Sequence, residues 1–189
     1  MKLNKKLLAA TVISLTAISG AYAVDQDIDA DVTFRTALSF ANAVAMDFGT
    51  IDVGGSAAAV TFDMDVTDGS ITNSDTTNYT APASGTLGSV ELEGDTGATV
   101  DISCETSGVL ANSGGTSTIN LDNTDFDFNG ANITACAGLG TSPLSSTLTA
   151  GTDTIQVGGR LNLTAAPNIE AYSTTNTNGN PVTLRAVYQ

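Results

Sequence analysis

The chain of 189 residues contains no histidine and no tryptophan. Histidine is the commonest general base and metal ligand, so a serine or threonine hydroxyl here lacks its usual activating partner. All three lysines lie within the first six residues, which excludes Schiff-base chemistry from the rest of the chain. We therefore expect a protein that is not an enzyme and that needs no cofactor.

Aromatic residues are also few, at 5% of the chain, and they form no cluster along the sequence. A glycosidase would need two carboxylates in a cleft and usually aromatic rings that stack on the sugar. Residues 125–130 read DFDFNG, the first half of a calcium-binding EF-hand loop, but Cys136 stands where that loop needs its bidentate glutamate. We expect a strand with an acidic outer face there. A surface Ca²⁺ site, at residues 125–130 or at Asp63, Asp65 and Asp68, is the alternative.

The first residues of the chain form a separate segment. Residues 1–6 carry Lys2, Lys5 and Lys6, residues 7–18 are mostly apolar, and residues 21–23 read AYA. This is the pattern of a bacterial-type secretory signal peptide, so we expect residues 1–23 to be removed and the protein to be exported. The apolar run is too short to cross a bilayer as a helix and no later run is longer, which predicts that the protein is not an integral membrane protein.

Residues 24–189 keep three cations, Arg35, Arg160 and Arg185, against all 20 acids, which gives a formal charge of −17. Nucleic acids and anionic lipids bind basic surfaces, so neither is an expected partner. The charge is typical of a solvated exterior that keeps a secreted protein soluble.

Cysteine occurs only twice, as Cys104 and Cys136. In an exported chain the oxidising environment predicts a disulfide between them. A redox site would more typically show C-x-x-C spacing. In the chain-entropy model, the loop that this disulfide closes contributes roughly 3–4 kcal/mol of stability.

No stretch of the chain shows a sustained helical period. Instead, short runs with an apolar residue at every second position alternate with connections rich in Gly, Asn, Asp and Ser. Residues 86–93 and 98–105 flank the turn-forming GDTG and predict a hairpin. Within residues 117–128 an Asn-Thr step predicts a bulge or turn. Together these patterns predict an all-β protein, an antiparallel immunoglobulin-like β-sandwich formed by residues 41–189.

Both ends of the exported chain alternate regularly. Residues 24–40 predict either an arm that adds a strand to another subunit or the first strand of the domain, and the apolar face of this segment holds Ile28, Ala30, Val32, Phe34 and Leu38. Residues 181–189, PVTLRAVYQ, predict a last strand whose apolar face holds Val182, Leu184, Ala186 and Tyr188. This strand is either an ordinary closing strand or a recognition strand at the border of an incomplete sheet.

Two resemblances follow from these residues. The final LRAVYQ with its penultimate Tyr188, the signal peptide, the alternating N-terminal segment and the single disulfide resemble chaperone–usher pilins, the subunits of bacterial fimbriae. Separately, MDFGTI (residues 46–51), GDTGATVDIS (94–103), IQVGGRLNLT (155–164) and PVTLRAVY resemble a family of secreted bacterial domains of unknown function with an LDFGTI-like strand. That family has been associated with fimbrial-type sandwiches.

The pilin resemblance implies a sandwich that lacks one strand and is completed by a donor strand. A periplasmic chaperone would lend a strand beside the last strand, an outer-membrane usher would export the subunit, and the arm of a neighbouring identical subunit would then replace the chaperone. By position, the donor face is Ile28, Ala30, Val32, Phe34 and Leu38, and the acceptor strand is Val182, Leu184, Ala186 and Tyr188. The expected function is a structural subunit of an adhesive surface fimbria. The alternative is a monomeric secreted or surface-attached β-sandwich that binds glycan or Ca²⁺.

Overall fold

The computed structural model describes Val32 and residues 34–55, 58–149 and 152–189. The expected signal peptide and the candidate donor residues Ile28 and Ala30 lie outside these residues. By its contacts the chain divides into Met1–Phe34 and a second, larger unit, Arg35–Gln189, which contains every strand described below. We call this second unit the domain; the sequence placed its beginning at residue 41, six residues later.

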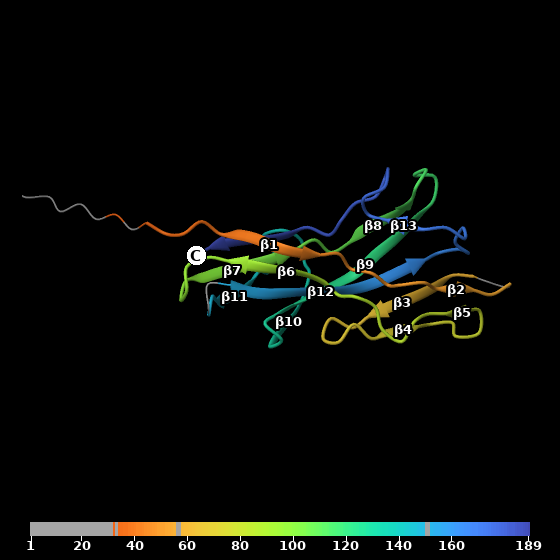
Figure 1. Cartoon of the computed structure of the whole chain (residues 1–189), viewed down its shortest axis with the longest axis horizontal. Coiled ribbons are helices and arrows are strands. Elements are labelled where there is room, and N and C mark those ends of the chain that lie inside the picture. Colours follow the sequence, from red (N-terminus) through yellow and green to blue (C-terminus); the bar gives the residue numbers. More distant parts are fainter. Residues whose placement is uncertain (1–31, 33, 56–57, 150–151) are drawn as a thin grey trace, which may run out of the picture. The chain divides into compact units, whose positions relative to one another are not determined.

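Fourteen antiparallel strands and no helix make up the described part of the domain (Figure 1). The predicted all-β class is therefore confirmed. No described segment forms a helix that is long and apolar enough to span a membrane. The strands are β1 (Ser39–Val44), β2 (Asp52–Val53), β3 (Val60–Met64), β4 (Ile71–Asn73), β5 (Tyr79–Thr80), β6 (Gly88–Glu93), β7 (Thr99–Cys104), β8 (Gly108–Asn112), β9 (Thr118–Phe128), β10 (Asn132–Ala135), β11 (Leu144–Thr147), β12 (Thr152–Leu163), β13 (Tyr172–Ser173) and β14 (Leu184–Tyr188).

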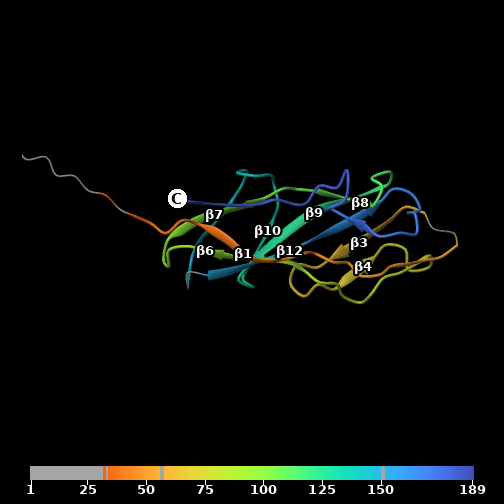
Figure 2. The same ribbon diagram turned by 45° about the horizontal axis from the view of Figure 1, so that its top comes forward.

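The strands form one large sheet and two small ones. The large sheet has nine strands, with the order β1-β6-β12-β9-β8-β13, and β3, β4 and β10 attached beside this path. A three-stranded sheet has the order β11-β7-β14, and β2 pairs with β5. The chain's last strand, β14, therefore lies in a different sheet from its first strand, β1 (Figures 1 and 2).

The three-stranded sheet covers one half of the large sheet. Alternate residues of β6, β9 and β12 meet alternate residues of β7 in a buried apolar cluster that includes Leu92, Ile102, Phe126 and Ile155. All four side chains are almost fully buried. This is the core of a β-sandwich, and the period-two pattern of each strand is what places its apolar side chains there.

A second cluster fills the other half of the domain. It joins the far ends of the long strands β9 and β12, through Leu121 and Leu161, to Phe62 of β3 and to Tyr79 of β5. Phe62 and Tyr79 meet edge to face, with ring centroids 5.6 Å apart. Because β9 and β12 run through both clusters, they connect the two halves of the core.

The predicted hairpin between residues 86–93 and 98–105 is wrong. The first run, as β6, pairs with β1 and β12, whereas the second, as β7, pairs with β11 and β14. Both strands bury their apolar face in the same cluster but from opposite layers, so GDTG is a corner between sheets. A Cβ at Gly94 would lie 2.7 Å from both Leu148 Cδ1 and Tyr188 Oη, so a larger residue at this corner would force these side chains to move.

Two smaller predictions are confirmed. Asn123, in the predicted Asn-Thr bulge, has a φ of 46°, and the pairing of β9 with β12 shifts register opposite it, between Gly158 and Arg160. Cys104 and Cys136 form a disulfide with their Cα atoms 5.0 Å apart. The disulfide joins the end of β7 to the segment after β10, so it links the two layers of the sandwich.

Candidate functional site

Two strands of the domain, β1 and β14, lie at open sheet edges. Within the described residues, β1 pairs only with β6, and β14 pairs only with β7. Each of these strands therefore has one edge whose backbone N–H and C=O groups are not used by another described strand. Such an edge can be extended by a further strand.

The inward face of β1 is not covered. Phe40 lies directly opposite Leu92 of β6, so the two side chains point to the same face of the sheet. Leu92 is fully buried, yet Phe40 is 43% exposed. A large apolar side chain on the core side of a sheet is normally covered by the facing layer, and here that layer ends before it reaches β1.

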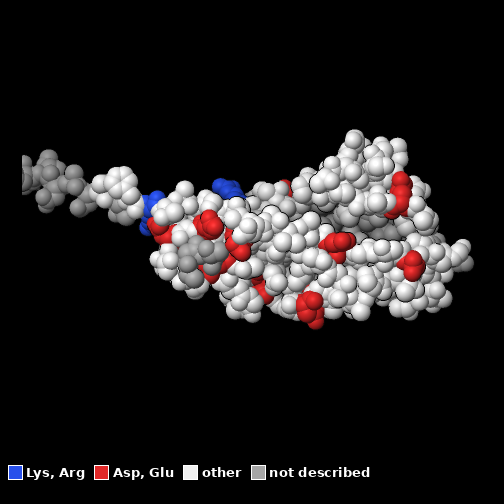
Figure 3. Space-filling model, viewed as in Figure 1, with Lys and Arg blue, Asp and Glu red and all other residues white. Residues whose placement is uncertain are grey.

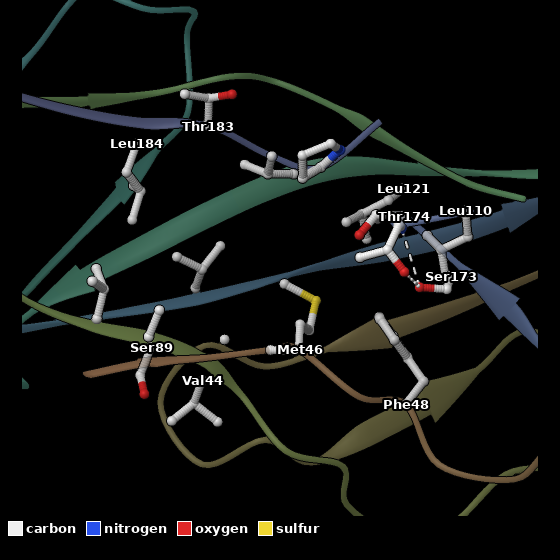
Figure 4. A pocket seen from close by; sticks show the side chains of 18 of the residues that line it. Val44, Met46, Phe48, Ser89, Leu110, Leu121, Ser173, Thr174, Thr183 and Leu184 are labelled. Carbon is white, nitrogen blue, oxygen red and sulfur yellow. Dashed lines mark hydrogen bonds between the residues drawn. The ribbon is translucent and has the colours of Figure 1, made fainter. Parts of the chain in front are cut away.

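A groove of about 600 Å³ lies along β1 and reaches the start of β14 (Figure 4). One wall is the segment from Phe40 to Phe48, and the other is formed by residues 172–175 and 181–184. Its floor comes from the large sheet and includes Val90, Leu121 and Val157. In Figure 4 the side chains of Met46 and Leu184 point into the space from opposite walls.

A second hollow of about 550 Å³ continues the groove past β1 and is lined by residues of the second core cluster. The two hollows share Met46, Phe48, Leu110 and Tyr172. We call the two hollows together the edge groove. Residues 40–53 follow one side of it over its whole length.

Local sequence explains the shape of the groove wall at the MDFGTI motif, residues 46–51. Asp47 exchanges two backbone hydrogen bonds with Thr86, of 2.9 and 2.8 Å, which ties the wall to the large sheet. The Asp47 carboxylate accepts a hydrogen bond from the N–H of Gly49 at 2.8 Å, and Gly49 turns the chain with a φ of 70°. Met46 and Phe48, on either side of Asp47, consequently line the groove.

The predicted acceptor strand contributes only part of this groove. Val182 and Leu184 line it, in the second wall. Ala186 and Tyr188 are half-buried against the first core cluster, beyond the hollow. All four side chains point inward, as their alternation predicted.

Tyr188 has a specific set of contacts at the end of β14. Its hydroxyl donates a hydrogen bond to the carbonyl of Thr36 at 2.8 Å and accepts one from the N–H of Asp95 at 2.9 Å. The N–H of Thr36 in turn donates to the Asp95 carboxylate, 3.0 Å from each oxygen. The Arg35 guanidinium lies 5.5 Å from the centre of the Tyr188 ring and donates to the carbonyl of Gln189. We call Arg35, Thr36, Asp95 and Tyr188 the terminal clasp.

The electrostatics of the terminal clasp favour an ionised aspartate. Hydrogen bonding from Thr36, assisted by the positive charge of Arg35, lowers the pKa of Asp95 below its ordinary value of 3.8. The clasp therefore joins the start of the domain, its C-terminal strand and the corner after β6 while Asp95 is charged.

The candidate donor residues separate into two groups. Leu38 is half-buried against the core of its own domain, so it is anchored there together with Ser39 and Phe40 of β1. Val32 and Phe34 precede the domain and are exposed. From here on, residues 24–34 are called the arm.

The candidate calcium ligands hold local structure. Asp65 accepts hydrogen bonds from the N–H and hydroxyl of Thr67, which lower the pKa of its carboxyl, and Asp68 accepts from the N–H of Ser70. Residues 125–128 belong to β9, as predicted, but Asp127 is buried and accepts from the N–H of Asn132. Among the described residues, no three acidic or cysteine side chains are grouped as a metal site would require.

Most groove residues were not identified as functional from the sequence. Phe40 was assigned to the leading segment, and Leu110 and Tyr172 were not singled out. The sequence feature that could have indicated the groove is the MDFGTI motif, which contains the groove residues Met46 and Phe48.

Comparison with known proteins gives one match. Residues 38–179 match the model of a family described as a domain of unknown function, DUF4402. The match runs from just before β1 to just after β13, and thus includes the MDFGTI wall and the floor of the edge groove. No curated protein and no solved structure matches the chain.

Proposed function

The chain belongs to the DUF4402 family, and we propose that it is a structural subunit of a bacterial surface fimbria, assembled by donor-strand exchange. In this mechanism the edge groove accepts the arm of a neighbouring identical subunit. A periplasmic chaperone occupies the groove before assembly, and an outer-membrane usher exports the subunit to the cell surface. A role of the fibre in adhesion is part of the same proposal.

The observation that carries the proposal is an apolar groove that lies along the open edge strand β1 and reaches the start of the open edge strand β14 at Leu184. A strand placed between β1 and β14 would find unused backbone groups on both sides and apolar side chains beneath it. It would also cover Phe40, whose exposure on the core side of β1 is otherwise unexplained. In a complete sandwich, the facing layer would cover the apolar side chains of the edge strand.

The arm has the composition and length of such a strand. Its apolar residues Ile28, Ala30, Val32 and Phe34 share one face. At about 3.3 Å per residue, its 11 residues span about 36 Å, while the 14 residues of the groove wall span at most about 46 Å. Each large apolar side chain buried would contribute roughly 1.5–3 kcal/mol, which is enough in sum for a slowly exchanging joint.

Two full-length variants with complementary defects test this function. Ile28→Asp with Val32→Asp disrupts the apolar face of the arm, and Phe40→Glu places a charge in the groove at a side chain that is 43% exposed and points to the core side of β1. We expect wild type to form SDS-resistant ladders and each variant alone to remain monomeric. Mixed together, the two should form one-to-one heterodimers, because the intact arm of one enters the intact groove of the other.

Size-exclusion chromatography with light scattering measures these outcomes. The proposal fails if wild type never forms SDS-resistant ladders, or if the arm variant polymerises as wild type does. Deletion of residues 24–33 gives a further check. The subunit that lacks these residues should become more stable when an arm peptide is added.

A further inference from the structure

The cations of the domain are placed unevenly. Arg160, on β12, is paired with Asp122 at 2.8 Å. Arg185 lies in β14, and Arg35 contacts Tyr188 and Gln189 at the end of the same strand. Among the described residues, neither Arg35 nor Arg185 forms an ion pair with a carboxylate. On the face shown in Figure 3, the basic groups lie only toward the end of the domain that holds the C-terminus.

Arg185 points away from the core. Its neighbours Leu184 and Ala186 are half-buried on the inner side of β14, whereas Arg185 is exposed on the outer side. A strand added to the open edge of β14 would place the side chains of its own outer face directly beside Arg185. Side chains opposite each other on adjacent strands have Cβ atoms about 4.5–5.5 Å apart, close enough for an ion pair.

The arm carries the complementary charge on the required face. When Ile28, Ala30, Val32 and Phe34 face the groove, the alternate residues Asp25, Asp27, Asp29 and Asp31 face outward. No other alternating run of the chain holds four aspartates at every second position. The charges of the arm and of the open β14 edge are therefore opposite.

Building on the proposed function, we propose that Arg185 forms an ion pair with an aspartate on the outer face of the arm of a second copy and thereby restricts that strand to registers in which one of its four aspartates lies beside Arg185. Apolar side chains alone define register poorly here, because a shift of two residues keeps the same face inward. Because the aspartates also recur at every second position, a two-residue shift within residues 25–31 keeps an aspartate beside Arg185, whereas a larger shift leaves Arg185 without a partner of opposite charge. Arg185 thus acts as a specificity-determining residue.

Binding of a labelled arm peptide, residues 24–34, to the full-length subunit that carries Ile28→Asp and Val32→Asp tests this inference by fluorescence anisotropy, because the groove of this variant is not filled by a neighbour's arm. In these experiments wild type denotes this variant with Arg185 unchanged. Against wild type, Arg185→Gln should weaken binding roughly two- to fivefold, the range expected of one opposite-charge cross-strand pair. Arg185→Glu should weaken it further, because like charges on adjacent strands repel. Arg185→Lys, the matched control, should bind within about twofold of wild type, because the charge is kept.

Peptides with a single Asp→Asn change identify the partner aspartate. In a double-mutant cycle with Arg185→Gln, one of Asp25, Asp27, Asp29 and Asp31 should show coupling and the others should not. Salt near 1 M, where the Debye length is about 3 Å, should abolish the difference between wild type and Arg185→Gln.

The outcomes separate this inference from the proposed function. If the peptide binds equally to wild type, Arg185→Gln and Arg185→Glu, the role of Arg185 is overturned while strand uptake by the groove stands. Equal coupling of all four aspartates would also overturn it, since an ion pair with one aspartate couples to that residue more strongly than to the others. If the peptide binds to none of the proteins, the proposed function fails and this inference fails with it.

Discussion

The hydroxyl of Tyr188 donates a hydrogen bond to the backbone carbonyl of Thr36 at 2.8 Å, across 152 positions of sequence. Sequence reasoning singled out Tyr188 as a recognition residue for a chaperone. Its position assigns it a structural role, because the same hydroxyl accepts a hydrogen bond from the N–H of Asp95 at the corner after β6. The start of the domain is thereby tied to its last strand, β14.

Removing this hydroxyl should weaken the domain without altering its core. Tyr188→Phe loses two hydrogen bonds but keeps the ring, and we expect the free energy of unfolding to fall by about 1 kcal/mol, since each such bond contributes about 0.5–1.5 kcal/mol net and this site is partly exposed. Tyr188→Ala, which also removes the ring, should cost about 2–3 kcal/mol. Urea unfolding followed by circular dichroism measures both, and equal stability of Tyr188→Phe and wild type would contradict the role of the terminal clasp.

Stability should depend on the ionisation of Asp95. Its pKa is lower in the folded protein than the ordinary 3.8, so its contribution is fully present above the unfolded-state pKa and is lost as pH falls through the lower folded-state value. Between pH 5 and pH 3, we expect wild type to lose stability more steeply than Asp95→Asn. A pH profile of Asp95→Asn that runs parallel to that of wild type would contradict the prediction.

A pair of variants should separate the groove from the core. Phe40→Ser changes a side chain that is 43% exposed, and should cost the isolated domain about 1 kcal/mol while weakening uptake of the arm peptide. Leu92→Ala, at the fully buried position opposite, should cost about 2–5 kcal/mol of unfolding free energy. Thermal unfolding and peptide anisotropy are measured on both variants. Leu92→Ala should lose more stability, whereas Phe40→Ser should lose more peptide binding. If Leu92→Ala lost more of both, Phe40 would be an ordinary core residue.

The disulfide should contribute a large share of the stability. Cys104 and Cys136 are separated by 32 positions, and closure of such a loop contributes about 3–4 kcal/mol in the chain-entropy model. Cys104→Ala with Cys136→Ala should lower the free energy of unfolding by about that amount under oxidising conditions. Under reducing conditions wild type should approach the variant, and a difference that persists after full reduction would assign the effect to packing instead.

Strand identity was predictable for physical reasons that act locally. A strand with one buried face must alternate, so the runs that became β3, β6, β7 and β14 were readable from residues alone. The Asn-Thr bulge and the disulfide were predictable too, because each depends on the chemistry of one or two residue types.

Strand neighbours were not predictable in the same way. Val90 and Val100 carry the same alternation whether their strands pair as a hairpin or face each other across a core, and the structure places them across the core. The groove was missed for a related reason. Phe40, Met46 and Leu110 read as ordinary apolar residues, and only their assembly between two unpaired edges makes them a surface.

The sequence by itself determined the fold class, the inward faces of β3, β6, β7 and β14, the disulfide and the excess of acid, because each follows from composition or from the two-residue period of a strand. Tertiary structure alone decided that β1 and β14 end in different sheets with an uncovered gap between them, and that Tyr188 meets Thr36 at one end of that gap. Both depend on contacts between residues far apart in the chain, which no local pattern encodes. Whether an edge is open is a property of the completed sandwich, since a strand's own residues do not say which strand will lie beside it.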